Sequence, residues 1–239
     1  MPYFDPVHCR IDAFTALSDQ LPELDTTDGL LHAAVAVSMH ELDEADSLEV
    51  ETALDDLAEQ VQDRVFGDDP RAVVAHTHHV LFEEARFRGN LGDYDEPANS
   101  YLPRVLRTRL GLPITLSLIY KAVLERVGVP AVGINAPGHF LAAIPAIAAG
   151  SLSTTNTLAF IDVFAGGRLL DRDEALERII NAAGGNLLLD ESLDLLPVAT
   201  HKQWLMRIIR NLHMGFNRKD QRDDANAMAE MMRLVEEAG

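Results

Sequence analysis

One helical face in the first third of the chain carries side chains that could bind a metal. His76, His79 and Glu83 recur at helical spacing within a helix expected over residues 70–86, with His78 beside them. Two imidazoles and a carboxylate suit zinc or iron. The alternative is a half-buried polar stripe whose histidines hydrogen-bond to the backbone, and it is favoured because no second helix offers a complement. We therefore expect no metal and no other cofactor.

The start of a strongly apolar helix is a second place where chemistry could occur. This helix is expected from about Ile114 to Val127, and the turn Gly111-Leu112-Pro113 precedes it. Proline is favourable at a first helical position because it has no N–H to leave unsatisfied. Apolar residues on almost every side predict a buried helix. Since a helix N-terminus favours negative charge, polar residues near this point require an explanation.

Sequence blocks around this helix resemble the invasion-regulator-type (SirB-like) transglutaminase-like proteins, a divergent second branch of the transglutaminase-like core. The resemblance is close over roughly residues 70 to 175 and looser over most of the chain. The blocks that carry it occur in the same order, and they include Arg86-Phe87-Arg88-Gly89-Asn90, Asn99-Ser100-Tyr101-Leu102, Gly111-Leu112-Pro113-Ile114-Thr115-Leu116-Ser117, Pro137-Gly138-His139-Phe140-Leu141, Phe160-Ile161-Asp162-Val163-Phe164 and Gly166-Gly167-Arg168-Leu169-Leu170.

The resemblance implies a cysteine-protease-like core in which a cysteine begins the buried helix and a histidine and an aspartate come from the following strands. A helix N-terminus and a neighbouring histidine both lower a thiol pKa, which gives a thiolate nucleophile. His139 and Asp162 match the histidine and aspartate positions. The nucleophile position falls on Pro113, or on Ile114 with a shift of one residue, and neither side chain can attack. The one cysteine, Cys9, is far away in sequence.

Two hydroxyls near the helix start could replace the missing thiol. Thr115 is the closer one but is β-branched and less nucleophilic, and Ser117 lies one turn into the helix. With His139 and Asp162 they would complete a triad. The alternative, which we favour, is that His139 and Asp162 hydrogen-bond to each other or to neighbouring polar groups and hold the fold together.

Several polar residues that belong to the family pattern lie between two expected core helices. We expect Asn99 and Ser100 to cap the helix from Leu102, and Arg109 to pair with a nearby buried carboxylate. The residues expected to line the cleft are Asn90, Tyr94, Asn99, Ser100, Arg109 and Pro113.

Hydrophobic periodicity and the family resemblance together predict an α+β chain in three segments. Periodicity predicts a helical N-terminal subdomain over residues 1–88. The resemblance implies a transglutaminase-like core with a small antiparallel sheet over residues 89–198, and a tetratricopeptide-like helical pair over residues 199–239 that packs on that core. The helices are expected over 11–22, 29–42, 47–65, 70–86, 102–110, 114–127 and 173–183 and in the tail, the strands over 131–134, 140–144, 158–163 and 168–170, and the run 187–196 is ambiguous.

Composition limits the possible functions. The 239 residues are 47% hydrophobic, enough for a sizeable core, and contain one cysteine, which fits a reducing compartment. Neither a membrane-spanning run nor a signal-peptide pattern is present, so a soluble cytoplasmic protein is expected. A formal net charge of −18 argues against nucleic acid as a partner, because binding phosphates needs a basic surface.

Two functional classes follow. The first is a non-catalytic, regulatory scaffold, a pseudoenzyme whose cleft and helical tail bind another protein or a peptide. The second is an atypical hydrolase or acyltransferase that uses His139 and Asp162 with a hydroxyl or water. The absent thiol favours the first class and leaves the question of catalysis open. The sequence predicts neither the oligomeric state nor the identity of the partner.

Overall fold

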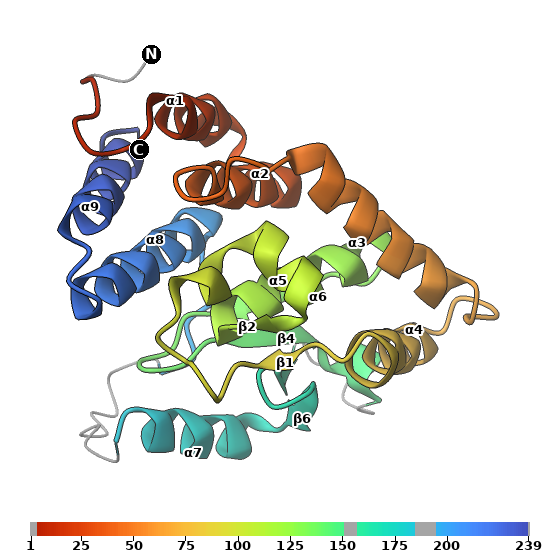
Figure 1. Cartoon of the computed structure of the whole chain (residues 1–239). Coiled ribbons are helices and arrows are strands. Elements are labelled where there is room, and N and C mark those ends of the chain that lie inside the picture. The colour runs from red at the N-terminus through yellow and green to blue at the C-terminus, as the bar shows by residue number, and fades with distance from the viewer. Residues whose placement is uncertain (1–3, 151–156, 185–194, 239) are drawn as a thin grey trace. The chain divides into compact units, whose positions relative to one another are not determined.

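A computed structural model describes residues 4–150, 157–184 and 195–238 (Figure 1). Helices combine with a small antiparallel sheet in these residues, which confirms the predicted α+β class. The chain divides into two compact units, each discontinuous in sequence. Unit 1 comprises Met1–Thr52, Asn90–Thr115 and Thr200–Gly239, and unit 2 comprises Ala53–Gly89 and Leu116–Ala199. The divisions fall inside helices α3 (Ser47–Gln62) and α6 (Pro113–Arg126).

Unit 1 combines helices from both ends of the chain. Helices α1 and α2 pack against each other, α8 and α9 form a helical hairpin, and the two pairs meet through contacts of α2 with α8 and of α1 with α9 (Figure 1). The 3₁₀ helix η3 also contacts α8. The elements that lie wholly in unit 1 are α1 (Ile11–Gln20), η1 (Leu21–Glu23), α2 (Thr27–Ser38), η3 (Pro97–Ser100), α5 (Leu102–Thr108), β2 (Leu110–Gly111), α8 (His201–Arg218) and α9 (Arg222–Glu237).

The C-terminal hairpin is helical for the reasons that the sequence suggests. Thr200 and Gln203 form a capping box at the start of α8, and an apolar stripe beginning at Trp204 and Leu205 is buried. Met228 and Met231 of α9 are also buried, so this methionine stripe is part of the core. The indole Nε1 of Trp204 donates to the carbonyl oxygen of Ile114 at 3.2 Å, which ties α8 to the start of α6.

Unit 2 contains a four-stranded antiparallel sheet in the order β3-β4-β5-β6. Each strand pairs with the next along the chain, which is the arrangement expected for short hairpin connections. The elements that lie wholly in unit 2 are α4 (Pro70–His78), the π-helix η2 (His79–Glu84), β1 (Arg88–Gly89), β3 (Val132–Ile134), β4 (Leu141–Pro145), η4 (Ala146–Ala149), β5 (Leu158–Asp162), β6 (Arg168–Leu170) and α7 (Arg172–Ala182).

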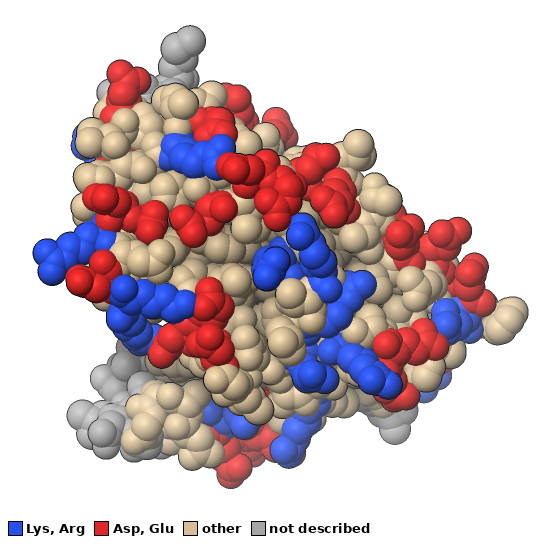
Figure 2. All heavy atoms as spheres, in the orientation of Figure 1, with Lys and Arg blue, Asp and Glu red and all other residues tan. Residues whose placement is uncertain are grey.

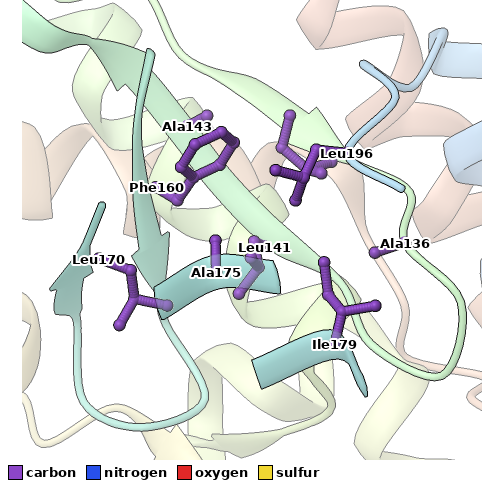
Figure 3. Close-up of a cluster of buried hydrophobic side chains, with 9 residues drawn as sticks. Ala136, Leu141, Ala143, Phe160, Leu170, Ala175, Ile179 and Leu196 are labelled. Atoms are coloured by element: carbon purple, nitrogen blue, oxygen red, sulfur yellow. The ribbon is translucent and has the colours of Figure 1, made fainter. Parts of the chain in front are cut away.

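Helix α7 covers one face of this sheet. Ala175 and Ile179, one helical turn apart on α7, lie in a cluster of buried side chains with residues of all four strands or their flanks (Figure 3). The register pairs Val132 with Ala143, and Ala143 with Phe160, so alternate strand residues face α7. The cluster consists of Ile134, Ala136, Leu141, Ala143, Phe160, Leu170, Ala175, Ile179 and Leu196.

The helix predicted over 70–86 is not a regular α-helix throughout. It is α-helical to His78 and continues as a π-helix over His79–Glu84. A π turn holds more residues than an α turn, so the predicted alignment of side chains is lost beyond His78. At the junction, His78 Nε2 lies 2.8 Å from the Tyr120 hydroxyl, and the ring of Phe82 packs against both aromatic groups.

Burial sets the protonation of this aromatic cluster. It lowers the pKa of His78 from 6.5 to about 4, so the imidazole is neutral at neutral pH. Burial also raises the pKa of the Tyr120 hydroxyl, which therefore stays protonated and donates to His78 Nε2.

Most predicted element boundaries agree with the structure to within a few residues. The predicted strand over 158–163 corresponds to β5, and the predicted helix over 173–183 corresponds to α7, which begins at Arg172 after an Asp171–Glu174 capping box. The ambiguous run 187–196 lies largely outside the described residues. Among the described helices, none combines the length and apolar character needed to cross a membrane.

We predict that Trp204→Phe destabilises the protein by about 1 to 3 kcal/mol, because it removes the buried hydrogen bond from the indole Nε1 to the carbonyl oxygen of Ile114. Urea unfolding followed by circular dichroism measures the change. Met214→Ala on the same helix is the control, since Met214 is 47% exposed and should change stability by no more than about 0.5 kcal/mol. Equal effects of the two substitutions would contradict the proposed hydrogen bond.

We also predict that His78 makes stability depend on pH. The folded-state pKa is depressed, so the unfolded chain binds more protons between pH 6.5 and 4, and stability falls as pH falls through this window. The full effect amounts to roughly 3 kcal/mol, from about 1.4 kcal/mol per pKa unit. In His78→Gln this part of the pH dependence is expected to disappear. Identical profiles of unfolding free energy against pH for the two proteins would refute the prediction.

Candidate functional site: a buried histidine–aspartate–arginine cluster

Asp162 is the centre of the candidate site in unit 2. It ends strand β5 and is only 1% exposed. The backbone N–H of Ala165 donates to its Oδ1 at 3.1 Å, and the N–H of Gly167 donates to its carbonyl oxygen at 3.0 Å. The tight turn after β5 therefore fixes both the backbone and the side chain of Asp162.

His139 reaches Asp162 from the turn that precedes β4. Gly138 has a φ of 71°, and a Cβ there would come within 3.1 Å of the Ala182 carbonyl oxygen, so this position requires glycine. Ala136 and Leu141 are buried on either side of the turn and hold it to the sheet. His139 thus lies just before β4, in agreement with the strand predicted over 140–144.

His139 and Asp162 lie within ion-pair distance of each other, but their contact lacks hydrogen-bond geometry. His139 Nε2 lies 3.4 Å from Asp162 Oδ1, and this nitrogen has no hydrogen bond within the described residues. The pair is brought together because Leu141 of β4 aligns with the end of β5, as the register Ala143–Phe160 and Ala142–Ile161 requires. His139 is 7% exposed, so the approach to its ring is narrow.

Arg178 of α7 is the third member, and sequence reasoning missed it. Its Nε donates to Asp162 Oδ2 at 2.5 Å. Arg178 is next to Ile179, whose burial against the sheet sets the rotation of α7, so the arginine lies at the border of the apolar stripe. A charged residue at the border of an apolar stripe is the one sequence feature that could have indicated Arg178. This feature does not identify the carboxylate with which the arginine pairs.

Electrostatics keep Asp162 ionised. Burial raises the pKa of this carboxyl, but the neighbouring His139 and the Arg178 guanidinium outweigh burial and hold the pKa below its usual value. A carboxylate already paired with arginine stabilises an imidazolium less than an unpaired carboxylate does, because the two cations share one negative charge. The cluster can orient His139, and it is a weaker support for proton transfer than a simple histidine–aspartate pair.

The residues at the start of α6 offer no accessible nucleophile in this conformation. Pro113 begins the helix, as predicted, and Ile114 after it is buried. Thr115 and Ser117 are fully buried, and their hydroxyl oxygens form no hydrogen bond within the described residues. Buried hydroxyls without partners are energetically unfavourable, which makes both residues notable.

Cys9, the one cysteine of the chain, lies in unit 1, and its thiol has low reactivity. Burial first, and then the charges of Glu230 and Asp12, raise the pKa of its thiol to about 12. At neutral pH the reactive thiolate is therefore almost absent.

The predicted cleft residues of unit 1 form a structural network. Asn90 Nδ2 donates to Asn99 Oδ1 at 2.9 Å, and Asn99 Nδ2 donates to the carbonyl oxygens of Asp93 and Tyr94 at 2.7 and 3.2 Å. The carbonyl of Asn99 accepts from the N–H of Leu112 at 3.1 Å. These bonds fasten the loop that begins at Asn90 to the residues before α6.

The predicted helix caps at Asn99 and Ser100 are wrong. Both residues belong to η3, and the N-cap of α5 is Tyr101, which makes no capping side-chain bond. The amide of Asn99 is used by the loop network instead. Arg109 ends α5 in a left-handed conformation with φ of 64°, burial lowers its pKa, and Tyr94 remains about half exposed.

The candidate metal ligands His76, His79 and Glu83, which the sequence analysis did not favour, do not converge as a set of three. His79 Nδ1 lies 2.9 Å from Glu83 Oε2, and His79 Nε2 lies 3.2 Å from Glu84, so carboxylates occupy both ring nitrogens. The π turn after His78 removes the regular spacing on which the prediction depended. Within the described residues, the metal-capable side chains that do converge belong to a different set, described below.

Comparison with known proteins identifies the family of the chain. A model of the transglutaminase-like superfamily matches residues 48–210, most of the chain, including the α6 start, His139 and Asp162. The chain belongs to the transglutaminase-like superfamily.

Several individual relatives match the chain over part of their own length. A UPF0162 protein of Xylella fastidiosa is 36% identical over 164 residues, which cover 68% of this chain and 56% of that protein. A UPF0162 protein of Pseudomonas aeruginosa is 33% identical over 95 residues, 38% of this chain and 34% of that protein. Human F-box only protein 21 is 36% identical over 93 residues, 39% of this chain and 15% of that protein. The chain spans about half the length of the Xylella relative. No solved structure matches.

We predict that Arg178→Gln destabilises the protein above pH 4 by about 1 to 3 kcal/mol, because it leaves the buried Asp162 carboxylate less compensated. The depressed pKa of Asp162 contributes stability that is present above its unfolded value near 4 and is lost as pH falls through the folded value. In Arg178→Gln this acid-dependent loss should shrink. Urea unfolding between pH 2 and pH 7 measures both effects.

Arg168→Gln is the matched control for this experiment. Arg168 pairs with Glu174 at 3.1 Å in the same unit, but both side chains are exposed, so its loss should change stability by less than about 1 kcal/mol. Asp162→Asn combined with Arg178→Gln should cost less than the sum of the two single substitutions. Additive single effects would argue against the pairing.

Proposed function

We propose that this chain is a non-catalytic transglutaminase-like protein of the invasion-regulator type that binds another protein or a peptide in the cytoplasm. The observation that carries the proposal is the chemistry at the nucleophile position. The family resemblance assigns that position to Pro113 or Ile114, and neither residue has a nucleophilic atom. The one thiol of the chain, that of Cys9, is held protonated by its surroundings.

The state of the remaining triad residues supports the same conclusion. Asp162 is paired with Arg178 as well as with His139, an arrangement suited to holding α7 against the sheet. The two hydroxyls that could replace a thiol, Thr115 and Ser117, are fully buried. A nucleophile must lie within hydrogen-bond reach of its base and must also meet the substrate, and a fully buried hydroxyl does not satisfy the second requirement.

The charge distribution favours a basic partner. In Figure 2, Asp and Glu side chains lie over α1 and α2, whereas Lys and Arg side chains gather over α5, where Arg104 and Arg107 are exposed. With a formal net charge of −18, the chain should attract positively charged peptides and repel nucleic acid. The match of one segment to part of longer F-box only proteins is consistent with its use as a module.

The second candidate is an atypical hydrolase or acyltransferase. The retained contact between His139 and Asp162 is the observation that favours it, since a histidine oriented through Nε2 has Nδ1 available as a base. That chemistry would need a water or one of the two buried hydroxyls as nucleophile.

An activity comparison separates the two candidates. We expect the wild-type chain to show no turnover of activated esters, amides or glutamine–amine pairs above buffer, and no covalent adduct at Thr115 or Ser117 by mass spectrometry. Turnover that disappears in His139→Ala, with an unchanged circular dichroism spectrum, would establish the enzyme instead. His139→Gln provides a second variant in case the alanine variant does not fold.

A display screen tests the binding half of the proposal. Random peptides presented to the folded chain are expected to enrich Lys- and Arg-rich sequences, with affinities that weaken as salt rises. Failure to enrich any peptide would count against a peptide-binding role, whatever the activity assays show.

A further inference from the structure

A cluster of metal-capable side chains lies in unit 1 and contains none of the residues that the sequence analysis considered as ligands. His40 and Glu41 follow the end of α2, and Asp224 lies in the first turn of α9. His40 Nε2 and Asp224 Oδ1 are 3.2 Å apart although 184 positions separate the residues in sequence. One ligand atom from each of the three side chains lies within 4.8 Å of the others.

Backbone and side-chain contacts hold these groups in place. The N–H of Glu41 donates to the Ser38 carbonyl at 3.2 Å, which continues the turn after α2. Gln221 Nε2 donates to Asp224 Oδ2 at 3.2 Å and leaves Oδ1 directed at His40. His40 itself is buried, Asp224 is half-buried and Glu41 is exposed. The cluster is thus anchored inside the unit and open at one side.

Tyr101, in the same unit, has a buried hydroxyl without a partner. Its side chain is 3% exposed, and its hydroxyl forms no hydrogen bond within the described residues. Burial first, and then the charges of Glu41, Asp224 and Glu96, raise the pKa of this hydroxyl, so it stays protonated. A buried O–H donor without an acceptor is expected where a further group completes its hydrogen bonding.

The charges of the cluster favour a cation. Glu41 and Asp224 each place a carboxylate oxygen within 4.8 Å of the other. Two carboxylates so close together repel each other, and a bound dication removes that repulsion. One imidazole nitrogen and two carboxylate oxygens suit a first-row transition ion better than Ca²⁺ or Mg²⁺, which prefer oxygen ligands only.

We propose that His40, Glu41 and Asp224 bind a divalent transition-metal ion of the Zn²⁺ class, and that the Tyr101 hydroxyl donates to a water or anion held on that ion. The proposal goes beyond the proposed function and does not depend on it. Three protein ligands leave at least one position on a tetrahedral ion for an exogenous ligand.

Binding requires one local rearrangement at His40. The N–H of Arg10 donates to His40 Nδ1 at 3.4 Å, which places the imidazole proton on Nε2. A metal on Nε2 moves that proton to Nδ1, so the long contact with Arg10 opens and Nδ1 becomes a donor. The N-terminal segment that carries Arg10 should therefore shift when the ion binds.

The full-length chain, freed of metal with a chelator and titrated with Zn²⁺ by isothermal calorimetry, tests the proposal. We expect one equivalent of Zn²⁺ to bind, Asp224→Asn and Glu41→Gln each to weaken binding at least about tenfold, and Tyr101→Phe to weaken it less while keeping one equivalent. Co²⁺ should give a visible absorption spectrum of low coordination number that is lost in Asp224→Asn. The backbone amide of Arg10 should shift in a Zn²⁺ titration followed by NMR.

Glu83→Gln is the matched control, because His79 and Glu83 form an exposed histidine–carboxylate pair at 2.9 Å in unit 2. It should leave the high-affinity equivalent unchanged. Circular dichroism of the metal-free variants establishes that each is folded. The proposal is overturned if folded Glu41→Gln and Asp224→Asn bind Zn²⁺ like the wild type, if Glu83→Gln abolishes binding, or if the wild type binds no Zn²⁺.

Discussion

The buried carboxylate of Asp162 is the constraint on which the arrangement of unit 2 depends. A charge that is removed from water must be paired, and Asp162 meets this requirement with His139 before β4 and Arg178 on α7. These contacts form only if β4 has the correct register on β5 and α7 packs correctly on the sheet. The ion pairs and the apolar cluster around Ile179 therefore specify the same geometry. The ion pairs and the apolar contacts therefore favour the same arrangement of the strands and α7.

This arrangement also gives His139 and Asp162 a structural role in the fold. Asp162 lies 3.4 Å from His139 Nε2 and pairs with Arg178, and these contacts link the end of β5 to the turn before β4 and to α7. Arg178 adds to that structural role, and it shares the carboxylate that would otherwise support an imidazolium. The proposed non-catalytic function follows from this competition together with Pro113.

Unit 1 shows a different use of polar groups, because its contacts join the two ends of the chain. The carboxylate of Glu230 on α9 accepts from the N–H groups of Val7, His8 and Cys9 at 2.8 to 3.1 Å. His40 and Asp224 add a second link between the N-terminal helices and α9. The methionine stripe and Trp204 supply the apolar part of this association. A metal bound by His40, Glu41 and Asp224 would reinforce the same junction.

The sequence by itself determined the class of fold, nearly every helix and strand, and the candidate His139 and Asp162. Hydrophobic periodicity, proline, glycine and capping residues act over one or two helical turns, so their effects can be predicted from the sequence alone. Only the tertiary structure decided that Arg178 meets Asp162, that Asn99 fastens a loop and caps no helix, and that His40 meets Asp224 across 184 positions. It also decided that a π turn breaks the His76, His79 and Glu83 face. Such partnerships depend on strand register, helix rotation and chain topology, because a charged side chain accepts many partners and only packing selects one of them.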